Sequence, residues 1–293
     1  MKAVVLGSAA GGGFPQWNCR CANCELAWQK DPRARWRTQS SLALSAGEDV
    51  VLVNASPDIG QQLRSHDLLQ PRSSRHSPVS TVVLTSAEID HVAGLATLRE
   101  RHAFDLVALS PVQAAIVGNP LFEPLQARRV TAAADEQFER SSGLWFSLFP
   151  VPGKVPLYLE AEGVIESADG EVAGLVARQG GASLLYVPGC ADISEPLNEK
   201  ALQADVILFD GTLFDDEEMI RAGLGTKTGR RMGHMPMTGP GGSLDWLAAL
   251  PASRKIYVHI NNSNPVLIEG SRERRLVESA GVEIAHDGLE IVL

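Results

Sequence analysis

Four polar side chains that could bind or activate a metal ion lie in the stretch Thr85-Ser-Ala-Glu-Ile-Asp-His91, and they are Ser86, Glu88, Asp90 and His91. The β-branched run 79–84 before them predicts a buried strand, and the apolar residues after them recur at helical spacing. We therefore expect these side chains where a strand ends and a helix begins, the usual position of a site on an open α/β sheet. The alternative is an ordinary helix start with a solvated His91, because a short motif is weak evidence without its context.

A cluster of cysteines forms a second candidate metal site. Three thiols lie within the six residues Cys19-Arg-Cys-Ala-Asn-Cys24, and they are Cys19, Cys21 and Cys24. Thiolates this close can converge on one Zn²⁺ ion, which is structural when a fourth protein ligand completes its tetrahedron. The spacing does not identify that ligand, and the candidates are His234, His259, Asn262 and Cys190. Three buried free thiols are the alternative, which the tight spacing disfavours.

The composition is that of an ordinary globular chain. With 293 residues, 44% of them hydrophobic and 21% charged, one α/β domain is preferred over two smaller ones. The net charge of -9 argues against nucleic acid or an anionic membrane surface as the main partner. No apolar run approaches the roughly 20 residues that span a bilayer, and the N-terminus lacks a cleavable signal pattern. We therefore expect no membrane insertion and a cytoplasmic location.

The elements that must position these residues follow from alternating strand and helix patterns. Expected strands cover 3–6, two runs within 40–53, 79–84, 106–109, 144–151, 182–187, 204–210 and 255–260. Expected helices include one capped by Ser56, one from Ser110, one over 243–250 and one over 272–279, and a last hairpin turns at Asp287-Gly288. The glycine-rich loop 7–15 predicts a tight turn rather than a phosphate cradle, because no Gly-Lys-Ser/Thr follows it.

A glycine-rich stretch, 223–242, predicts a loop that contacts the substrate. It carries Lys227, Arg230, Arg231 and His234, and loops on a rigid α/β scaffold are where substrate contacts concentrate. The cations would suit a substrate with carboxylates, although a solvated face fits them as well. An unengaged surface loop is the alternative for the whole stretch.

The motif at 85–91 resembles the T-H-x-H-x-D-H signature of the metallo-β-lactamase fold. Ser86 and Glu88 stand where the first two histidines of that signature would be, whereas Asp90 and His91 match. Lys154, after the strand 144–151, stands in the place of a third histidine ligand. Without the resemblance, Lys154 would be interpreted as a plain surface lysine after a turn.

Two later steps extend this resemblance. Tyr186-Val-Pro-Gly-Cys-Ala-Asp192 resembles the step at which the fold supplies a metal-bridging aspartate, and this assigns the role to Asp192, with Cys190 as a further ligand or a buried thiol. Gly233-His234 resembles the pair that phosphodiesterases of the superfamily place over the metal. Asp210, at the end of the strand 204–210, is expected to orient a metal ligand by a hydrogen bond without binding the metal itself.

The segment His259-Ile-Asn-Asn-Ser-Asn-Pro265 narrows the resemblance to the coenzyme PQQ synthesis protein B family. The opening Gly7-Ser-Ala-Ala-Gly-Gly-Gly-Phe-Pro-Gln-Trp-Asn-Cys-Arg-Cys-Ala-Asn-Cys24 and Asn54-Ala-Ser-Pro-Asp-Ile59 are also similar to that family, so the resemblance covers almost the whole chain. It implies a metallo-β-lactamase-like αββα sandwich of two mixed sheets flanked by helices. It further implies a single domain over 1–293, with a zinc clip around 19–24.

The substitutions imply that one active-site metal is retained. In the wider family a first metal takes three histidines and a second takes an aspartate and two histidines. Ser86, Glu88 and Lys154 remove the first set, and Asp90, His91 and His259, with Asp192, keep the second. Two histidines and one carboxylate with open positions suit a non-haem Fe²⁺ that activates O₂, although a lone Zn²⁺ that activates water is also chemically reasonable.

The family resemblance implies an iron-dependent oxygenase of pyrroloquinoline quinone (PQQ) biosynthesis that hydroxylates the tyrosine ring of a Glu-Tyr-derived precursor. The candidate catalytic residues are His234, which would handle a proton, Glu88 and Ser86. One alternative is a carrier that escorts PQQ or its precursor towards the periplasm, and another is a metal-dependent hydrolase of the phosphodiesterase kind. The expected partner is a small-molecule or dipeptide-like precursor, and a homodimer is an expectation that the sequence does not test.

Overall fold

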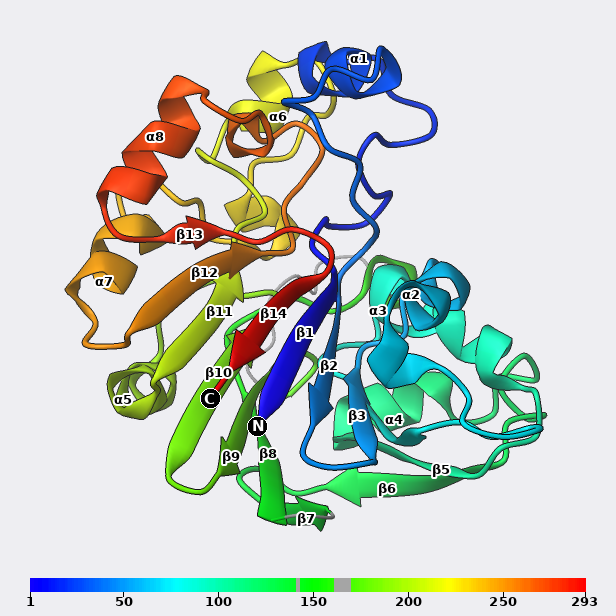
Figure 1. Cartoon of the computed structure of the whole chain (residues 1–293). Coiled ribbons are helices and arrows are strands. Elements are labelled where there is room, and N and C mark those ends of the chain that lie inside the picture. Colours follow the sequence, from blue (N-terminus) through cyan, green and yellow to red (C-terminus); the bar gives the residue numbers. More distant parts are fainter. Residues whose placement is uncertain (141–142, 161–169) are drawn as a thin grey trace.

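The computed structural model describes residues 1–140, 143–160 and 170–293 of the chain. Over these residues, a pair of seven-stranded sheets packs face to face, with helices over both outer faces (Figure 1). One apolar core lies between the sheets and one lies under the helices of each outer face. This layering is the αββα sandwich of two mixed sheets that the resemblance implies, so the expected fold class is confirmed.

The first sheet combines antiparallel and parallel pairing. Its strands in spatial order are β14 (Leu289–Val292), β1 (Lys2–Gly7), β2 (Ser41–Ser45), β3 (Val50–Val53), β4 (Val79–Val83), β5 (Phe104–Leu109) and β6 (Ala127–Ala132). The pairs from β14 to β3 are antiparallel, and those from β3 to β6 are parallel. Its outer face is covered by α2 (Ile59–Ser65), α3 (Ile89–Val92), α4 (Ser110–Ile116), η1 (Asp67–Leu69) and η2 (Ala93–Leu98).

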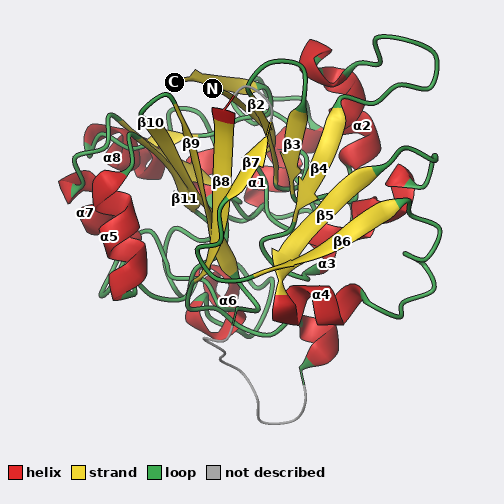
Figure 2. Cartoon of the chain, turned by 90° about the horizontal axis from the view of Figure 1, so that it is seen from below, coloured by secondary structure: helices red, strands yellow, loops and turns green. Residues whose placement is uncertain are grey.

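The second sheet is also mixed. Its strands in spatial order are β13 (Glu283–Ile284), β12 (Arg254–Val258), β11 (Val206–Asp210), β10 (Ala182–Val187), β9 (Ala173–Gln179), β8 (Leu144–Pro150) and β7 (Phe138–Arg140). β10 to β13 pair parallel and the others antiparallel. Its outer face carries α1 (Ala22–Trp28), α5 (Glu195–Gln203), α7 (Ser243–Ala249) and α8 (Arg272–Ser279). Figure 2 shows α5, α7 and α8 on the opposite side of the strands from α2 and α4.

The run 79–84, in which Ser80 and Thr81 are the polar members, does not alternate between apolar and polar residues because β4 is largely buried on both faces. Successive side chains of a strand point to opposite faces, and Val82 packs under the helices whereas Val83 packs between the sheets. A parallel strand in the middle of such a sandwich therefore has no polar alternation. The polar residues of the candidate site follow where β4 ends, and the segments after β11 and β12 reach the same edge of the sandwich. Four short elements complete this edge or lie near it: η4 (Leu157–Leu159), α6 (Glu218–Arg221), η5 (Arg230–Met232) and η6 (Pro265–Leu267).

Two local predictions are wrong. The last hairpin does not form, because β13 pairs with β12 in one sheet and β14 pairs with β1 in the other. The turn expected at Asp287-Gly288 is present, but it lies in a crossover between the sheets. The second helix begins at Ile59 rather than directly after Ser56, because the Ser56 hydroxyl accepts a hydrogen bond from the Asp58 N–H in a turn before the helix.

The described residues of the chain contain no helix with the length and apolar character that crossing a membrane requires.

Asp287 ties the crossover to the first sheet. Its carboxylate accepts hydrogen bonds from the backbone N–H and hydroxyl of Ser8, at 2.9 and 2.8 Å, and from those of Thr38, at 2.6 and 2.8 Å. These donors come from segments up to 279 positions away in the sequence. One carboxylate thus fixes three distant segments.

We expect Asp287→Ala to lower the free energy of unfolding by about 2–4 kcal/mol, because buried donors lose their acceptor. Urea unfolding followed by circular dichroism measures this. Asp287→Asn, which keeps one acceptor oxygen, should lie between the wild type and Asp287→Ala. A loss below about 1 kcal/mol for Asp287→Ala would show that the crossover is held by other contacts.

Candidate metal centres

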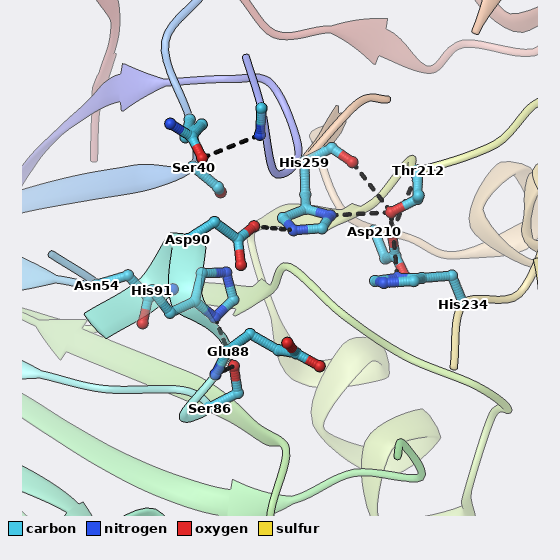
Figure 3. Close-up of polar contacts among 12 residues, drawn as sticks. Ser40, Asn54, Ser86, Glu88, Asp90, His91, Asp210, Thr212, His234 and His259 are labelled. Carbon is cyan, nitrogen blue, oxygen red and sulfur yellow. Dashed lines mark hydrogen bonds and ion pairs between the residues drawn. The ribbon is translucent and has the colours of Figure 1, made fainter. Parts of the chain in front are cut away.

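Asp90, His91 and His259 form a compact group of ligand atoms at the edge of the sandwich. One ligand atom from each lies within 4.8 Å of the others, and the three side chains turn toward one another (Figure 3). His91 and His259 are only 3% and 5% exposed. The structure therefore brings together the three residues that the sequence predicts as ligands of the retained metal.

Local hydrogen bonds fix the turn that presents His91. The side chain of Asn54 accepts a hydrogen bond from the Thr85 N–H at 2.9 Å and donates one to the Thr85 hydroxyl, also at 2.9 Å. The Ser86 hydroxyl lies 2.7 Å from His91 Nδ1. Ser86, which was predicted among the catalytic residues, thus orients an imidazole of the metal site.

The free nitrogen of His91 fits a metal ion. Nε2 is buried and has no hydrogen-bond partner among the described residues, which is costly for a polar atom unless a ligand satisfies it. Burial lowers the pKa of His91 to about 4, so its imidazole is neutral at pH 7. A neutral imidazole with an unpaired nitrogen is the form that binds metals.

Thr212 fixes the orientation of His259. Its hydroxyl donates a hydrogen bond to Asp210 Oδ1 at 2.6 Å and lies 2.9 Å from His259 Nδ1. Because the hydroxyl proton goes to Asp210, the oxygen can accept from Nδ1–H, which leaves Nε2 of His259 free to bind a metal. That Nε2 lies 3.1 Å from Asp90 Oδ2.

The carboxylates of the site are ionised. Burial alone would raise the pKa of Asp90, but the neighbouring His91 and His259 hold it well below its usual range. Burial likewise opposes ionisation of Asp210, and its contact with His234 lowers the pKa below the ordinary value. Two buried anions beside three imidazoles favour a cation between them.

Asp210, His234 and His259 form a second group whose ligand atoms also lie within 4.8 Å of one another. His234 Nδ1 lies 2.7 Å from Asp210 Oδ2, and the ring stacks on His259 with centroids 5.2 Å apart. Asp210 thus holds one nitrogen of His234, and the ring faces the cavity that it lines. This arrangement can hold a second ion or keep His234 ready for proton transfer. The alternative of an unengaged His234 is therefore wrong.

Asp192 lies apart from this network. Its carboxylate accepts a hydrogen bond from the Ile193 N–H, and among the described residues it belongs to neither group of close ligand atoms. Cys190 is a buried thiol that donates to the Asp192 carbonyl, and its backbone N–H donates to Asp210. The structure therefore does not bring the predicted bridging residue to the metal, because two residues, Cys190 and Ala191, separate Asp192 from the glycine of the turn.

A cavity of about 300 Å³ opens over the metal ligands. Its apolar lining includes Leu157, Val172, Met219 and Met232. Lys154 also lines it, with a side chain only 15% exposed and Nζ 3.0 Å from Glu160 and 3.6 Å from Glu88. The interpretation of Lys154 as a plain surface residue is therefore wrong.

The loop 223–242 contributes to this cavity as predicted, but not through all of its cations. Lys227 lines the cavity. Arg230 instead donates to the backbone carbonyls of Pro240 and Gly241, each at 3.0 Å, and so stabilises its own loop.

The three cysteine sulfurs converge as the sequence predicts, and they meet Asn262. Cys19, Cys21 and Cys24 form a third group of close ligand atoms. The Asn262 amide lies 3.2 Å from the Cys19 sulfur and 3.3 Å from that of Cys24. Rotation of the side-chain amide would bring its oxygen, which can bind a metal, to the place of its nitrogen beside the sulfurs. Of the four candidates for the fourth ligand, Asn262 is therefore the one that the fold places at the cysteines. The hydrogen bond between Cys21 and Cys24 lowers the pKa of the Cys21 thiol and raises that of Cys24, so that Cys21 ionises first.

Comparisons with known proteins agree with this geometry. A family model described as "Beta-lactamase superfamily domain" matches residues 50–260. The protein "Coenzyme PQQ synthesis protein B" of Methylobacterium nodulans is 53% identical over 300 residues, covering 100% of both chains. That of Rhizobium meliloti is 51% identical, covering 100% of this chain and 98% of its own.

Solved structures show the same relationship. The crystal structure of Zn²⁺-bound PqqB from Methylobacterium extorquens superposes with a TM-score of 0.97 at 50% identity, covering 100% of both chains. A diphosphatase of the PhnP family gives a TM-score of 0.70 at 21% identity, covering 100% of this chain and 97% of its own. The second likeness concerns the fold alone.

We expect Thr212→Val to weaken metal binding at the Asp90, His91 and His259 group by about 10–100-fold, because His259 loses the oxygen that orients it. Competition with a chromophoric chelator measures the affinity. Thr212→Ser keeps the hydroxyl and should bind as the wild type does. Equal affinities for Thr212→Val and the wild type would contradict the assigned role.

We expect Asn262→Ala to weaken zinc binding at the cysteine cluster at least about tenfold. Zinc retained per chain after graded chelation measures this, and Asn119→Ala, in an exposed loop, is the control. Retention equal to that of the control would rule out Asn262 as a ligand.

Proposed function

The chain belongs to the coenzyme PQQ synthesis protein B family of the beta-lactamase superfamily, and we propose that it acts in PQQ biosynthesis as a single-metal oxygenase. The proposed reaction is hydroxylation of the tyrosine ring of a Glu-Tyr-derived precursor. The proposed metals are Fe²⁺ at Asp90, His91 and His259, and Zn²⁺ at the three cysteines.

The observation that supports this proposal is the ligand set at the edge of the sandwich. Two imidazoles and one carboxylate meet there, whereas the positions of a first metal are used differently. Ser86 is engaged with His91, and Glu88 faces the ammonium of Lys154. The three-histidine site of the family's first metal, one half of the two-metal clamp on the attacking and leaving oxygens of a hydrolysis, therefore lacks its ligands.

Fe²⁺ held by two histidines and one carboxylate, with positions left open, supplies the activation of O₂. The chain supplies the rest. Ser86 and Thr212 keep the two imidazoles in one orientation. The apolar residues of the cavity, Leu157, Val172, Met219 and Met232, suit an aromatic ring and keep bulk water away from it.

His234 is the proposed proton acceptor. Its Nδ1 lies 2.7 Å from Asp210, which fixes the orientation of the ring. Nε2 can then take the phenol proton or the proton that leaves the ring carbon on hydroxylation. Glu88, whose pKa is raised by burial, is a second group in the cavity that can hold a proton.

The proposed reaction needs electrons from outside. Insertion of one oxygen atom into a ring C–H bond reduces the second atom of O₂ to water, and this consumes two electrons and two protons. An assay must therefore supply a reductant such as ascorbate.

A hydrolase is the second candidate, and the Asp210, His234 and His259 group favours it. One zinc ion beside an aspartate-held histidine can activate water for attack on an ester. The carrier hypothesis predicts tight binding of the precursor without turnover.

We expect one Fe²⁺ and one Zn²⁺ per chain after anaerobic reconstitution, and O₂ uptake with a Glu-Tyr dipeptide and ascorbate. His91→Ala should lose the iron and lower O₂ uptake at least about 100-fold, because it removes a metal ligand. His76→Ala, in the loop before β4 at the opposite end of that strand from the metal ligands, is the control. Metal analysis, an oxygen electrode and mass spectrometry of the peptide measure these outcomes.

Zinc alone, with no O₂ uptake under any reductant, would overturn the oxygenase. Ester hydrolysis that depends on His91 would then favour the hydrolase, and binding without turnover would favour the carrier.

A further inference from the structure

Lys154 places a fixed ammonium inside the cavity that holds the metal ligands. Its side chain is largely buried, and Nζ lies between Glu160 at 3.0 Å and Glu88 at 3.6 Å. Its stem packs on Gly233, where a side-chain Cβ would lie 2.7 Å from Lys154 Cγ. The glycine therefore leaves the room that the lysine stem occupies, next to His234.

Charged side chains of both signs surround Lys154. Lys227 also lines the cavity, and its charge, like that of Arg231, acts on Glu160. Three cations, Lys154, Lys227 and Arg231, thus lie near three carboxylates, Glu88, Glu160 and Asp90. Among the described residues, one guanidinium nitrogen of Arg231, Nη1, is buried without a partner.

An ammonium can serve several acceptors at once. It carries three N–H donors, and the carboxylate of Glu160 accepts one of them at 3.0 Å, whereas Glu88 forms an ion pair with the ammonium at 3.6 Å. Donors therefore remain for a ligand, and a carboxylate is the group that an ammonium in a partly buried site binds most strongly. Glu88 and Glu160 hold the ammonium in place, so that little conformational entropy is lost when a ligand binds.

The rest of the cavity defines the other end of the ligand. Leu157, Val172 and the methionines Met219 and Met232 line the cavity together with the charged residues and the metal ligands. A molecule that fits such a cavity combines a ring or another flat apolar group with an anionic group. A purely apolar ligand would leave the remaining N–H donors of Lys154 without an acceptor.

We propose that Lys154, supported by Lys227, is the specificity-determining residue that binds a carboxylate of the substrate. The metallo-β-lactamase pattern places a histidine at this position, and that histidine binds a metal that can in turn bind an anion. Here the fixed ammonium of Lys154 supplies the positive charge in place of that metal. The inference rests on the proposed function only for the identity of the substrate, a Glu-Tyr-derived precursor. The chemical class of the ligand, an aromatic carboxylate, follows from the cavity itself.

Binding without turnover tests this. The zinc-loaded protein is titrated under anaerobic conditions with two matched pairs of ligands, by calorimetry or by NMR. The first pair is the Glu-Tyr dipeptide and its fully amidated analogue, Gln-Tyr-amide. The second pair is 3-(4-hydroxyphenyl)propionate and its amide, which carry the ring and a single carboxylate.

We expect the wild type to bind the acid of each pair at least about tenfold more tightly than the amide. Lys154→Met, which keeps the length and packing of the stem, should reduce this ratio to within about twofold while the amide binds unchanged. Lys154→Arg should keep most of the ratio. Lys2→Met, which removes the remote ion pair with Glu290, should keep all of it.

Equal loss of acid and amide binding in Lys154→Met would show a merely structural role and overturn the inference. So would a wild type without acid preference in either pair. Acid preference in the propionate pair without any binding of Glu-Tyr would instead count against the proposed substrate and leave Lys154 as the anion site. Thermal unfolding and zinc content of each variant separate these results from misfolding.

Discussion

Both metal centres depend on one short segment, the six residues 259–264 that follow β12. His259 at its start belongs to the active-site group, and Asn262 meets the three cysteines. His259 adopts φ 55, a left-handed conformation that costs a non-glycine residue about 1 kcal/mol or more and persists only where surrounding contacts impose it. Those contacts come from the cysteine segment on one side and from the residues after β11 on the other. Asn23 donates to three carbonyls of the segment at 2.8 to 3.2 Å, and Asn264 donates to Gly211 and Thr212. The zinc clip and the active site therefore belong to one hydrogen-bonded structure.

Much of this could be predicted from sequence, because the decisive signals are local. The apolar run 79–84 followed by polar residues predicts a strand end, and such ends converge at one edge of a sandwich. The spacing of Cys19, Cys21 and Cys24 predicts a shared ion in the same way. The resemblance of the segment from His259 then fixes the fold class, which no propensity argument could have done alone.

What the sequence did not predict depends on contacts between distant residues. Four residues were equal candidates for the fourth zinc ligand, and only the fold brings Asn262 to the thiols. Thr212 was missed altogether, since a threonine after a strand has no spacing signal that links it to His259, and only the preceding Asp210 hinted at an orienting network. Asp192 was assigned by aligning a motif with an insertion, and that insertion turns its carboxylate away. The last hairpin failed because each of its strands finds a better partner in a different sheet.

The retained network around Asp210 bears on the chemistry of the site. If Asp210 and Thr212 served only a pair of metals, they would have no metal ligand to orient in a chain that lacks the first set of histidines. Instead, both still act on the candidate ligands: the Thr212 hydroxyl directs Nε2 of His259 toward Asp90, and Asp210 holds Nδ1 of His234. A metal that has only three protein ligands needs this fixation more than a metal pair does, because no second ion bridges and aligns the substrate. The alignment of the substrate must then come from the protein, and the cations and apolar residues of the cavity are the described groups positioned to provide it.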